Sequence, residues 1–210
     1  MAYDFKKEFK TLYAPPTAPT IVDVPTASFL AVRGKGDPNA TDGEYSAAMG
    51  LLYGVAYTLK MSHKTDYKID GFFEYVVPPL EGFWWQDGAA EIDYTRKERF
   101  EWISLLRLPN FVTAADVAWA ISEATRKKKA DFSAVEMLEY DEGLCVQAMH
   151  LGAYDDEPAT LAAMDTFARE NGFAVDISDN RYHHEIYLTD PKKTEPAKLK
   201  TVLRHPIKTM

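Results

Sequence analysis

Two segments of this chain have similar strand-like sequences and indicate an internal duplication. FLAVRGKG at residues 29–36 and CVQAMHLG at residues 145–152 both end in glycine, and both lead into an amphipathic helical pattern. Each pattern is followed by a strand-like segment with a glutamate in an aromatic setting, FFEYVV at 72–77 and HHEIYL at 183–188. This duplication predicts two copies of a β-α-β unit packed about a pseudo-twofold axis. One glutamate from each copy would then face the groove between them.

The duplication accounts for most of the chain. We predict one α+β domain over 1–210, built from two β-α-β-β modules. Repeat one covers about 20–110 and repeat two about 133–207. Apolar residues at helical spacing behind Thr113, a suitable N-cap, predict an additional helix over about 113–129 between the repeats.

The local patterns predict the elements of each repeat. A proline-rich arm at 11–25 is expected to be extended. Repeat one is expected to contain strands at 28–34, 68–77 and 100–108, a helix after the capping-box pair Thr41 and Glu44, and a loop (LEGFWW) at 80–85. Repeat two is expected to contain strands at 134–140, 145–152 and 183–188, a helix from about Asp156 to Asn171, and a last strand or extended tail at 199–206.

The composition restricts the class of partner. A net charge of −8 disfavours nucleic acid, whose phosphates need a basic surface. The single cysteine, Cys145, excludes an internal disulfide, lies in an apolar run and is expected to be a core residue. No apolar run approaches the length of a membrane span, and the first residues are too charged for a signal peptide. We therefore expect a cytoplasmic protein that binds neither nucleic acid nor membrane.

Two long stretches of the sequence carry a family resemblance. LCVQAMHLGAYDDEPATLAAMDTFARENG with HHEIYLTDPKKTEPAKLKTVLRHPI is similar to the second half of the GyrI-like small-molecule-binding family. FLAVRGKGDPNATDGEY and GFFEYVVPPLEGFWW resemble its first half in a longer, stand-alone branch. The resemblance implies paired β-α-β-β modules around a concave groove with a central glutamate. It also implies relatives that sense drugs, modulate gyrase or hydrolyse cyclopropanoid DNA-alkylating compounds.

Glu185 is the first candidate for chemistry. On a strand of period two, His183, Glu185 and Tyr187 share one face. A carboxylate that aromatic side chains shield from water is suited to accept a proton or to orient a water molecule near neutral pH. A solvated glutamate on an exposed sheet face is the alternative, and the family resemblance favours the functional role.

Glu74 is the expected counterpart of Glu185 in repeat one, on a face shared with Phe72. Two carboxylates across a groove would differ in protonation, which supports acid and base roles in one site. A negative, aromatic-lined groove would equally attract lipophilic cations. The sequence leaves both possibilities open.

Aromatic side chains are the candidate ligand contacts, among them Phe72, His183 and Tyr187 beside the two glutamates. Trp84 and Trp85 are neighbours, so one is expected to face the groove and to stack on a planar ligand while the other packs. Tyr53 and Tyr57 lie one helical turn apart, a spacing that fits a buried stripe and also a pair of phenols that reach a ligand.

The histidines do not predict a metal site. His183 and His184 are neighbours on a strand and face opposite ways, and no cysteine or carboxylate was expected as a third ligand. His150 lies at a strand end shortly before Tyr154 and is either a structural histidine or a ligand contact. Tyr154 is a second candidate for contact with the ligand. No glycine-rich nucleotide motif is present, so we expect no cofactor.

Two functions follow from these patterns. In the first, the protein hydrolyses a strained, electrophilic, planar aromatic compound, with Glu185 positioning water and Glu74 assisting. In the second, the same groove sequesters amphipathic or cationic toxins, or the protein contacts a partner such as gyrase. Only about twenty residues precede the first repeat, too few for a DNA-binding helix-turn-helix. The stand-alone resemblance favours the enzyme.

Overall fold

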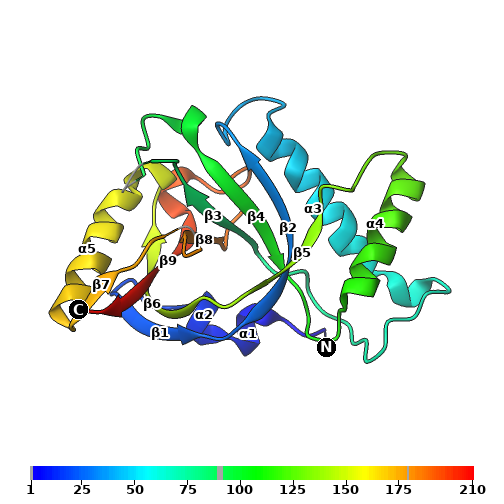
Figure 1. The fold of residues 1–210 in the computed structure, drawn as a ribbon, viewed down its shortest axis with the longest axis horizontal. Coiled ribbons are helices and arrows are strands. Elements are labelled where there is room, and N and C mark those ends of the chain that lie inside the picture. The colour runs from blue at the N-terminus through cyan, green and yellow to red at the C-terminus, as the bar shows by residue number, and fades with distance from the viewer. Residues whose placement is uncertain (1, 89–91, 179) are drawn as a thin grey trace. The chain divides into compact units, whose positions relative to one another are not determined.

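The computed structural model describes residues 2–88, 92–178 and 180–210 and has a mixed α+β architecture (Figure 1). The chain divides into two compact units, each assembled from separate stretches of sequence. The first unit comprises Met1–Asp4, Ala27–Pro78 and Gln86–Tyr140. The second comprises Phe5–Thr26, Pro79–Trp85 and Asp141–Met210.

The first unit is a three-stranded antiparallel sheet covered by helices. Its order is β4-β2-β5, with Phe29 of the central strand opposite Arg107 on one side and Leu138 on the other. Helix α3 packs against β2 and β4, and α4 packs against α3 and β5 (Figure 1). The elements are β2 (Ala27–Lys35), α3 (Glu44–Lys60), η1 (Ser62–Lys64), η2 (Lys97–Arg99), β4 (Glu101–Arg107), α4 (Ala114–Lys128) and β5 (Glu136–Tyr140).

The two helices of this unit begin differently. Helix α4 begins with a complete capping box, in which Thr113 and Asp116 satisfy each other's backbone N–H groups, as the sequence predicts. The capping box expected at Thr41 and Glu44 was wrong. Residue Gly43 is the N-cap of α3, and no side chain caps this end.

The strand predicted at 68–77 was also wrong. The segment that carries Phe72 and Glu74 is irregular, and its one bridge among the described residues joins Tyr75 to Tyr3. Gly71 turns the chain in the left-handed region, with a φ of 68°. The prolines at positions 78 and 79 lack the N–H groups that a longer ladder would need. Glu74 is therefore exposed on an irregular segment rather than on a counterpart of the strand that carries Glu185.

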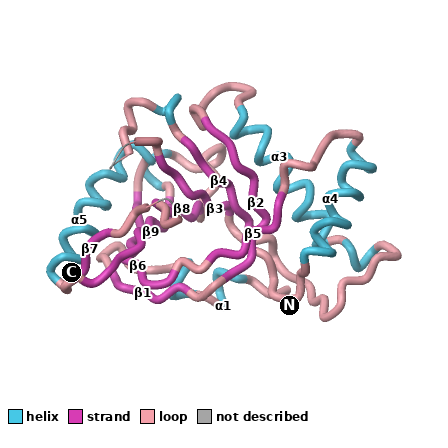
Figure 2. Tube along the Cα trace, viewed as in Figure 1, coloured by secondary structure: helices cyan, strands magenta, loops and turns pink. Residues whose placement is uncertain are grey.

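The second unit is built on a larger antiparallel sheet (Figure 2). Its order is β1-β6-β9-β8-β3, and β7 pairs with the end of β9. The strands are β1 (Thr20–Val24), β3 (Leu80–Trp85), β6 (Gly143–Leu151), β7 (Phe173–Val175), β8 (His183–Tyr187) and β9 (Lys200–Thr209). The helical elements are α1 (Phe5–Glu8), α2 (Lys10–Tyr13), η3 (Tyr154–Asp156), α5 (Glu157–Glu170) and η4 (Pro196–Lys198).

Helices cover both faces of this sheet. Helix α5 packs against β6 and β7, and its Met164 and Ala168 share a buried cluster with Leu203 of β9. Arg204, the next residue of β9, points to the other face and donates a hydrogen bond to the carbonyl of Leu12 in α2. Helix α5 ends before Gly172, which has a φ of 85°, as the sequence predicts.

Three predictions about the second unit were wrong in detail. The expected loop LEGFWW is strand β3, paired with β8, because its aromatic residues suit a buried strand. The expected extended arm at 11–25 contains part of α2 and then β1, which pairs with β6. Strand β5, expected to open repeat two, pairs with β2 in the first unit.

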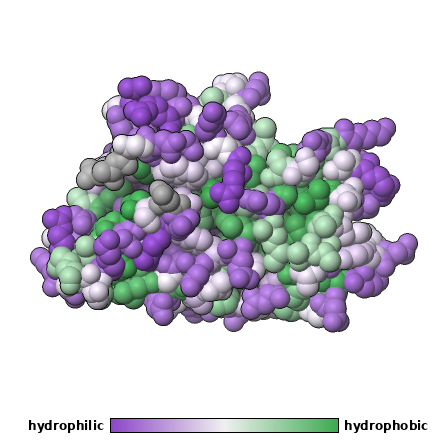
Figure 3. Space-filling view, viewed as in Figure 1, coloured by the Kyte–Doolittle hydropathy of each residue, from purple (hydrophilic) through white to green (hydrophobic). Residues whose placement is uncertain are grey.

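The order of elements is repeated, but with β3 in place of the strand expected at 68–77, so the expected match of Glu74 with Glu185 was wrong. The chain runs β2-α3-β3-β4 and later β6-α5-β7-β8-β9, and the predicted additional helix α4 lies between the two runs. None of the helices among the described residues has the length and apolar character to cross a membrane. In the face shown in Figure 3, hydrophobic side chains lie among hydrophilic ones. Cys145 is fully buried, and burial raises the pKa of its thiol, as expected for a core residue.

Candidate functional site

The candidate site lies in the second unit, on one face of β8. His183, Glu185 and Tyr187 point to this face, while His184 contacts carboxylates on the other. Nε2 of His183 lies 3.0 Å from Oε1 of Glu185. The residues His183 and Glu185 are both buried, with 1 % and 7 % of their surfaces exposed. The predicted alternation of neighbouring side chains along this strand is confirmed.

A chain of hydrogen bonds leads to Glu185. Nδ1 of His183 lies 2.7 Å from Nε2 of His205 on β9. Burial and the neighbouring His183 hold the pKa of His205 well below its ordinary value of 6.5, so His205 is neutral. With Glu185 ionised, His183 donates from Nε2 to the carboxylate and accepts at Nδ1 from His205. Both rings are thereby fixed in orientation.

A second carboxylate, Glu157, completes the site. It is fully buried at the first position of α5, and one of its oxygens lies within 4.8 Å of ligand atoms of His183 and Glu185. The carboxylate beside Glu185 in the second unit is thus Glu157, whereas Glu74 was expected. The expectation that no carboxylate would lie near His183 as a possible metal ligand was wrong as well. These three side chains together have the donor types of a metal site.

Two tyrosines lie beside these carboxylates. The rings of Tyr154 and Tyr187 meet edge to face with their centroids 5.7 Å apart. Burial, together with the negative charges of Glu185 and Glu157, raises the pKa of Tyr154 to about 12. Tyr154 is therefore protonated at neutral pH and keeps a hydroxyl proton to donate. The sequence named both tyrosines as site residues, and the structure brings both to the Glu185 side of the sheet.

Strand β3 supplies an indole to the same face. Nε1 of Trp84 donates a 2.8 Å hydrogen bond to the hydroxyl of Tyr187. Gly82 lies directly opposite Glu185, and a Cβ at this position would meet Nε1 of Trp84 at 2.7 Å. Trp85 points the other way and packs against Tyr182, with ring centroids 5.1 Å apart. Trp84 is thus the tryptophan that faces the Glu185 side.

The opposite face of the sheet holds a buried charged network. His184 contacts Glu142 at 2.9 Å and Glu81 at 3.0 Å. Arg204 donates to Glu142 at 2.9 Å, and Tyr13 of α2 donates to Glu81 at 2.8 Å. These interactions connect the second unit's N-terminal helical segment to its sheet, so the network is structural.

The charges in this network support each other. Burial alone would lower the pKa of His184, but Glu142 and Glu81 hold it above its ordinary value of 6.5. Burial alone would raise the pKa of Glu142, but His184 and Arg204 lower it to about 2. The imidazole of His184 therefore lies between two carboxylates in the interior, and one of these, Glu142, also binds the guanidinium of Arg204.

His150 has a structural position. Its Nε2 donates to the carbonyl of Ala153 at 3.0 Å, because a carbonyl can only accept. Its Nδ1 lies 2.9 Å from the hydroxyl of Thr160 in α5. Both ring nitrogens therefore fix the connection between β6 and α5, which carries Tyr154 and Glu157.

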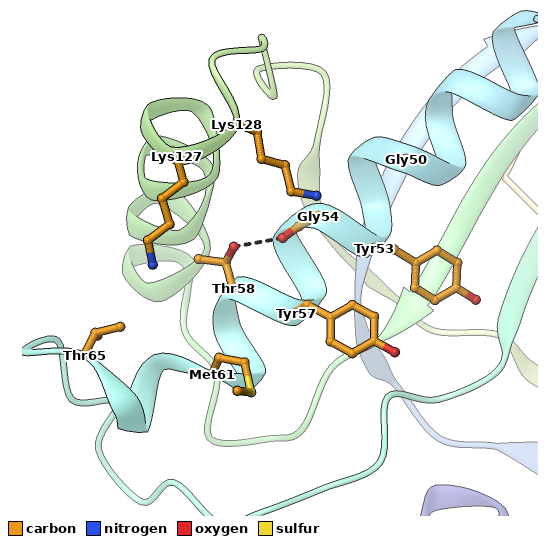
Figure 4. Close-up of a pocket in the computed structure, with 9 residues that line it drawn as sticks. All are labelled: Gly50, Tyr53, Gly54, Tyr57, Thr58, Met61, Thr65, Lys127 and Lys128. Carbon is orange, nitrogen blue, oxygen red and sulfur yellow. Dashed lines mark hydrogen bonds between the residues drawn. The ribbon is translucent and has the colours of Figure 1, made fainter.

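The remaining candidate residues lie in the first unit. Phe72 belongs to an aromatic group, with its ring centroid 5.5 Å from that of Phe111. Tyr53 and Tyr57 line a pocket of about 400 Å³ beside α3 (Figure 4). Tyr57 is 51 % exposed, which excludes the fully buried stripe that its spacing allowed.

This pocket also receives basic side chains from α4. Lys127 and Lys128 extend toward α3, while the two tyrosine rings point away from α4 (Figure 4). Thr58, which also lines the pocket, is fixed by a 2.8 Å hydrogen bond to the carbonyl of Gly54.

Sequence reasoning missed Glu157 and His205. Glu157 reads as an ordinary acidic residue in the first turn of a helix, where a carboxylate suits the helix dipole. His205 lies in the expected last strand, and its alternation with Leu203 could have placed it on a buried face. Only the register of β8 against β9 brings it beside His183.

Comparison with solved structures gives close matches. A hydrolase from Listeria innocua is 44% identical, with 98% of this chain and 100% of that chain covered and a TM-score of 0.89. An uncharacterized conserved protein from Listeria innocua is also 44% identical over 98% and 100%, with a TM-score of 0.92. The EcmrR C-terminal domain is 11% identical over 91% and 98%, with a TM-score of 0.55, a likeness of fold alone.

Sequence comparison identifies the family. A search of curated proteins gave no match. The GyrI-like small molecule binding domain matches residues 17–208, nearly the whole chain. The chain therefore belongs to the GyrI-like small-molecule-binding family.

Proposed function

We propose that this protein hydrolyses a planar, electrophilic small molecule, of the cyclopropanoid DNA-alkylating class, and so protects the cell in whose cytoplasm it acts. The observation that carries the proposal is the buried hydrogen-bonded series His205–His183–Glu185, which ends on a carboxylate. The description of a 44% identical structure as a hydrolase supports the same reaction class.

The residues support a direct addition of water. Glu185 accepts a proton from water, and the water oxygen attacks a carbon of the strained ring. The ring C–C bond breaks, and its electrons pass through the conjugated system to the carbonyl oxygen. That oxygen takes up a proton, so the product is the substrate plus one water molecule. Because ring strain drives the opening, the reaction needs no covalent enzyme intermediate.

Other groups on this face would bind the substrate. The hydroxyl of Tyr154 keeps its proton at neutral pH and can donate to the oxygen on which negative charge develops. Trp84 and Tyr187 offer aromatic surface with their polar atoms already hydrogen-bonded to each other. A planar substrate fits such a wall better than an extended polar one does.

The test is incubation with a panel of cyclopropanoid alkylators, with a chelator present and with ring-opened product followed by mass spectrometry. Product that increases linearly beyond one equivalent of protein means catalysis. Depletion that saturates at one equivalent, or no reaction, would contradict the proposal and leave a binding module that sequesters its ligand.

The sharpest variant is Glu185→Gln, which preserves shape but cannot accept a proton. Turnover should fall by roughly 10² to 10⁴, the usual contribution of a general base, with little change in affinity for a neutral substrate. The matched control is Glu74→Gln, which changes an exposed glutamate of the first unit. Normal turnover in Glu185→Gln would exclude Glu185 from the chemistry.

A further inference from the structure

The cluster of Glu157, His183 and Glu185 has a property that base catalysis does not use. Each of the three offers a ligand atom, all three are buried, and these atoms lie within 4.8 Å of one another. We propose that this cluster binds one divalent transition-metal ion, with Zn²⁺ as the ion that the donors fit best. The proposal rests on the same residues as the proposed function, but it does not require that function to be correct.

The donor set fits zinc chemistry. Zinc bonds to imidazole nitrogen and carboxylate oxygen are about 2.0 to 2.2 Å long, which places ligand atoms around a tetrahedral ion about 3.4 Å apart. The 3.0 Å separation between His183 and Glu185 is close to this value. The third ligand atom, an oxygen of Glu157 from α5, lies within 4.8 Å of the other two. Three protein ligands also leave one position for water.

The surroundings of His183 suit a metal ligand. A metal requires a lone pair on Nε2, so the ring proton must lie on Nδ1. Nε2 of His205, 2.7 Å away, is positioned to accept that proton. A metal-bound histidine commonly donates its second N–H to such an acceptor.

The charges of the cluster also favour a cation. Two buried carboxylates this close repel each other unless a proton or a cation lies between them. The buried guanidinium of Arg204 is on the opposite face of the sheet, where it binds Glu142.

Metal binding and base catalysis compete for the same lone pair. An ion on Glu185 occupies the oxygen that would accept the proton of water, so bound Zn²⁺ should slow the proposed hydrolysis and a chelator should restore it. The binding itself is measured without substrate. Uptake of Zn²⁺ with no hydrolysis under any condition would refute only the proposed function. Hydrolysis with no uptake would refute only this inference.

The experiment is titration of the chelator-treated full chain with Zn²⁺ by calorimetry and with Co²⁺ by visible absorption. We expect one ion per chain and Co²⁺ bands of nitrogen and oxygen ligands, without the strong near-ultraviolet band of a thiolate. Glu157→Gln and His183→Gln should each weaken binding by at least tenfold. The matched controls Glu74→Gln and His63→Gln, both in the first unit, should bind as the unaltered chain does.

Three results would overturn the inference. They are no uptake of either ion by the unaltered chain, a thiolate band, and equal affinity in Glu157→Gln. If a variant fails to fold, the melting temperature of the unaltered chain tests the inference. A bound ion must raise its melting temperature as Zn²⁺ concentration rises. Mg²⁺, which prefers all-oxygen sites, should raise it much less, and an equal rise with Mg²⁺ would also overturn the assignment.

Discussion

His183 and His205 share a 2.7 Å hydrogen bond between Nδ1 and Nε2 on the buried Glu185 side of the sheet. The two side chains come from adjacent strands, β8 and β9, whose register fixes the contact. Because His205 is neutral, it can act as donor or acceptor toward His183. The orientation of His183, and through it that of Glu185, therefore depends on His205.

The first prediction is that His205→Leu lowers kcat by about threefold to tenfold with little change in KM. The change removes one hydrogen bond of about 1 kcal/mol that positions His183. His205→Gln retains an N–H donor and should keep most of the activity. Steady-state kinetics with a cyclopropanoid substrate measures both. If the Gln variant is as impaired as the Leu variant, the positioning role is excluded.

The second prediction distinguishes the two tryptophans. Trp84→Phe removes the indole N–H that binds the Tyr187 hydroxyl, so affinity for a planar aromatic ligand should fall by about 0.5 to 1.5 kcal/mol. Trp85→Phe is the control, because Trp85 packs against Tyr182 on the other face. Calorimetric titration with the ring-opened product gives both affinities. A larger loss of affinity in Trp85→Phe would contradict the prediction, because it would place the ligand on the Tyr182 side of β3.

The third prediction concerns Gly82, which lies opposite Glu185. In Gly82→Ala the new methyl group would lie 2.7 Å from Nε1 of the rigid Trp84 indole, so the Trp84–Tyr187 pair must shift. We expect a loss of about 1 to 3 kcal/mol in unfolding free energy, together with weaker ligand binding. Gly50→Ala is the matched control. Nothing lies within 4 Å of that new methyl group on α3, so stability should rise by about 0.5 to 1 kcal/mol.

Chemical denaturation of both glycine variants gives the stability changes. Unchanged ligand affinity in a folded Gly82→Ala protein would show that the arrangement of Trp84 and Tyr187 does not matter for binding.

The fourth prediction is a pH dependence of stability. His184 and Arg204 overcome the effect of burial and lower the pKa of Glu142 from 4.5 to about 2. The stabilisation from its ionised form is therefore fully present above pH 4.5 and is lost as pH falls toward 2. This lowering of the Glu142 pKa corresponds to a contribution on the order of 3 kcal/mol to the free energy of unfolding.

Urea unfolding at a series of pH values measures this contribution. Glu142→Gln should be less stable at neutral pH, since the buried side chains of His184 and Arg204 lose a partner, and its stability should change less between pH 4.5 and 2. The exposed Glu139→Gln should keep the original pH profile. An unchanged slope in Glu142→Gln would assign the acid sensitivity to other groups.

Much of the fold could be predicted because its signals are local. The apolar stripe and glycine stop of α5, the capping box of α4 and the alternation of His183 with His184 all depend on residues close in sequence. These features are confirmed. The duplicated order of elements follows from the same local patterns.

The errors arose where distant pairing decides the structure. Both 72–77 and 80–85 are aromatic and apolar enough for a strand, and the choice between them depends on which one meets β8. In the structure 80–85 pairs with β8, which leaves Glu74 on an irregular segment. The sequence predicted the site residues of β8 together with Trp84 and Tyr154, but it missed Glu157 and His205, which reach the site from other elements.

The pairing of β1 with β6 has a consequence for biosynthesis. Residues 20–24 leave the ribosome well before their partners, which begin at Gly143, so β1 remains unpaired while the intervening chain is made. The last residue of the first unit is Tyr140, so this unit has emerged completely before β6 emerges. We therefore expect the first unit to fold before the second. The unpaired edge of β1 is then the segment most exposed to aggregation during synthesis.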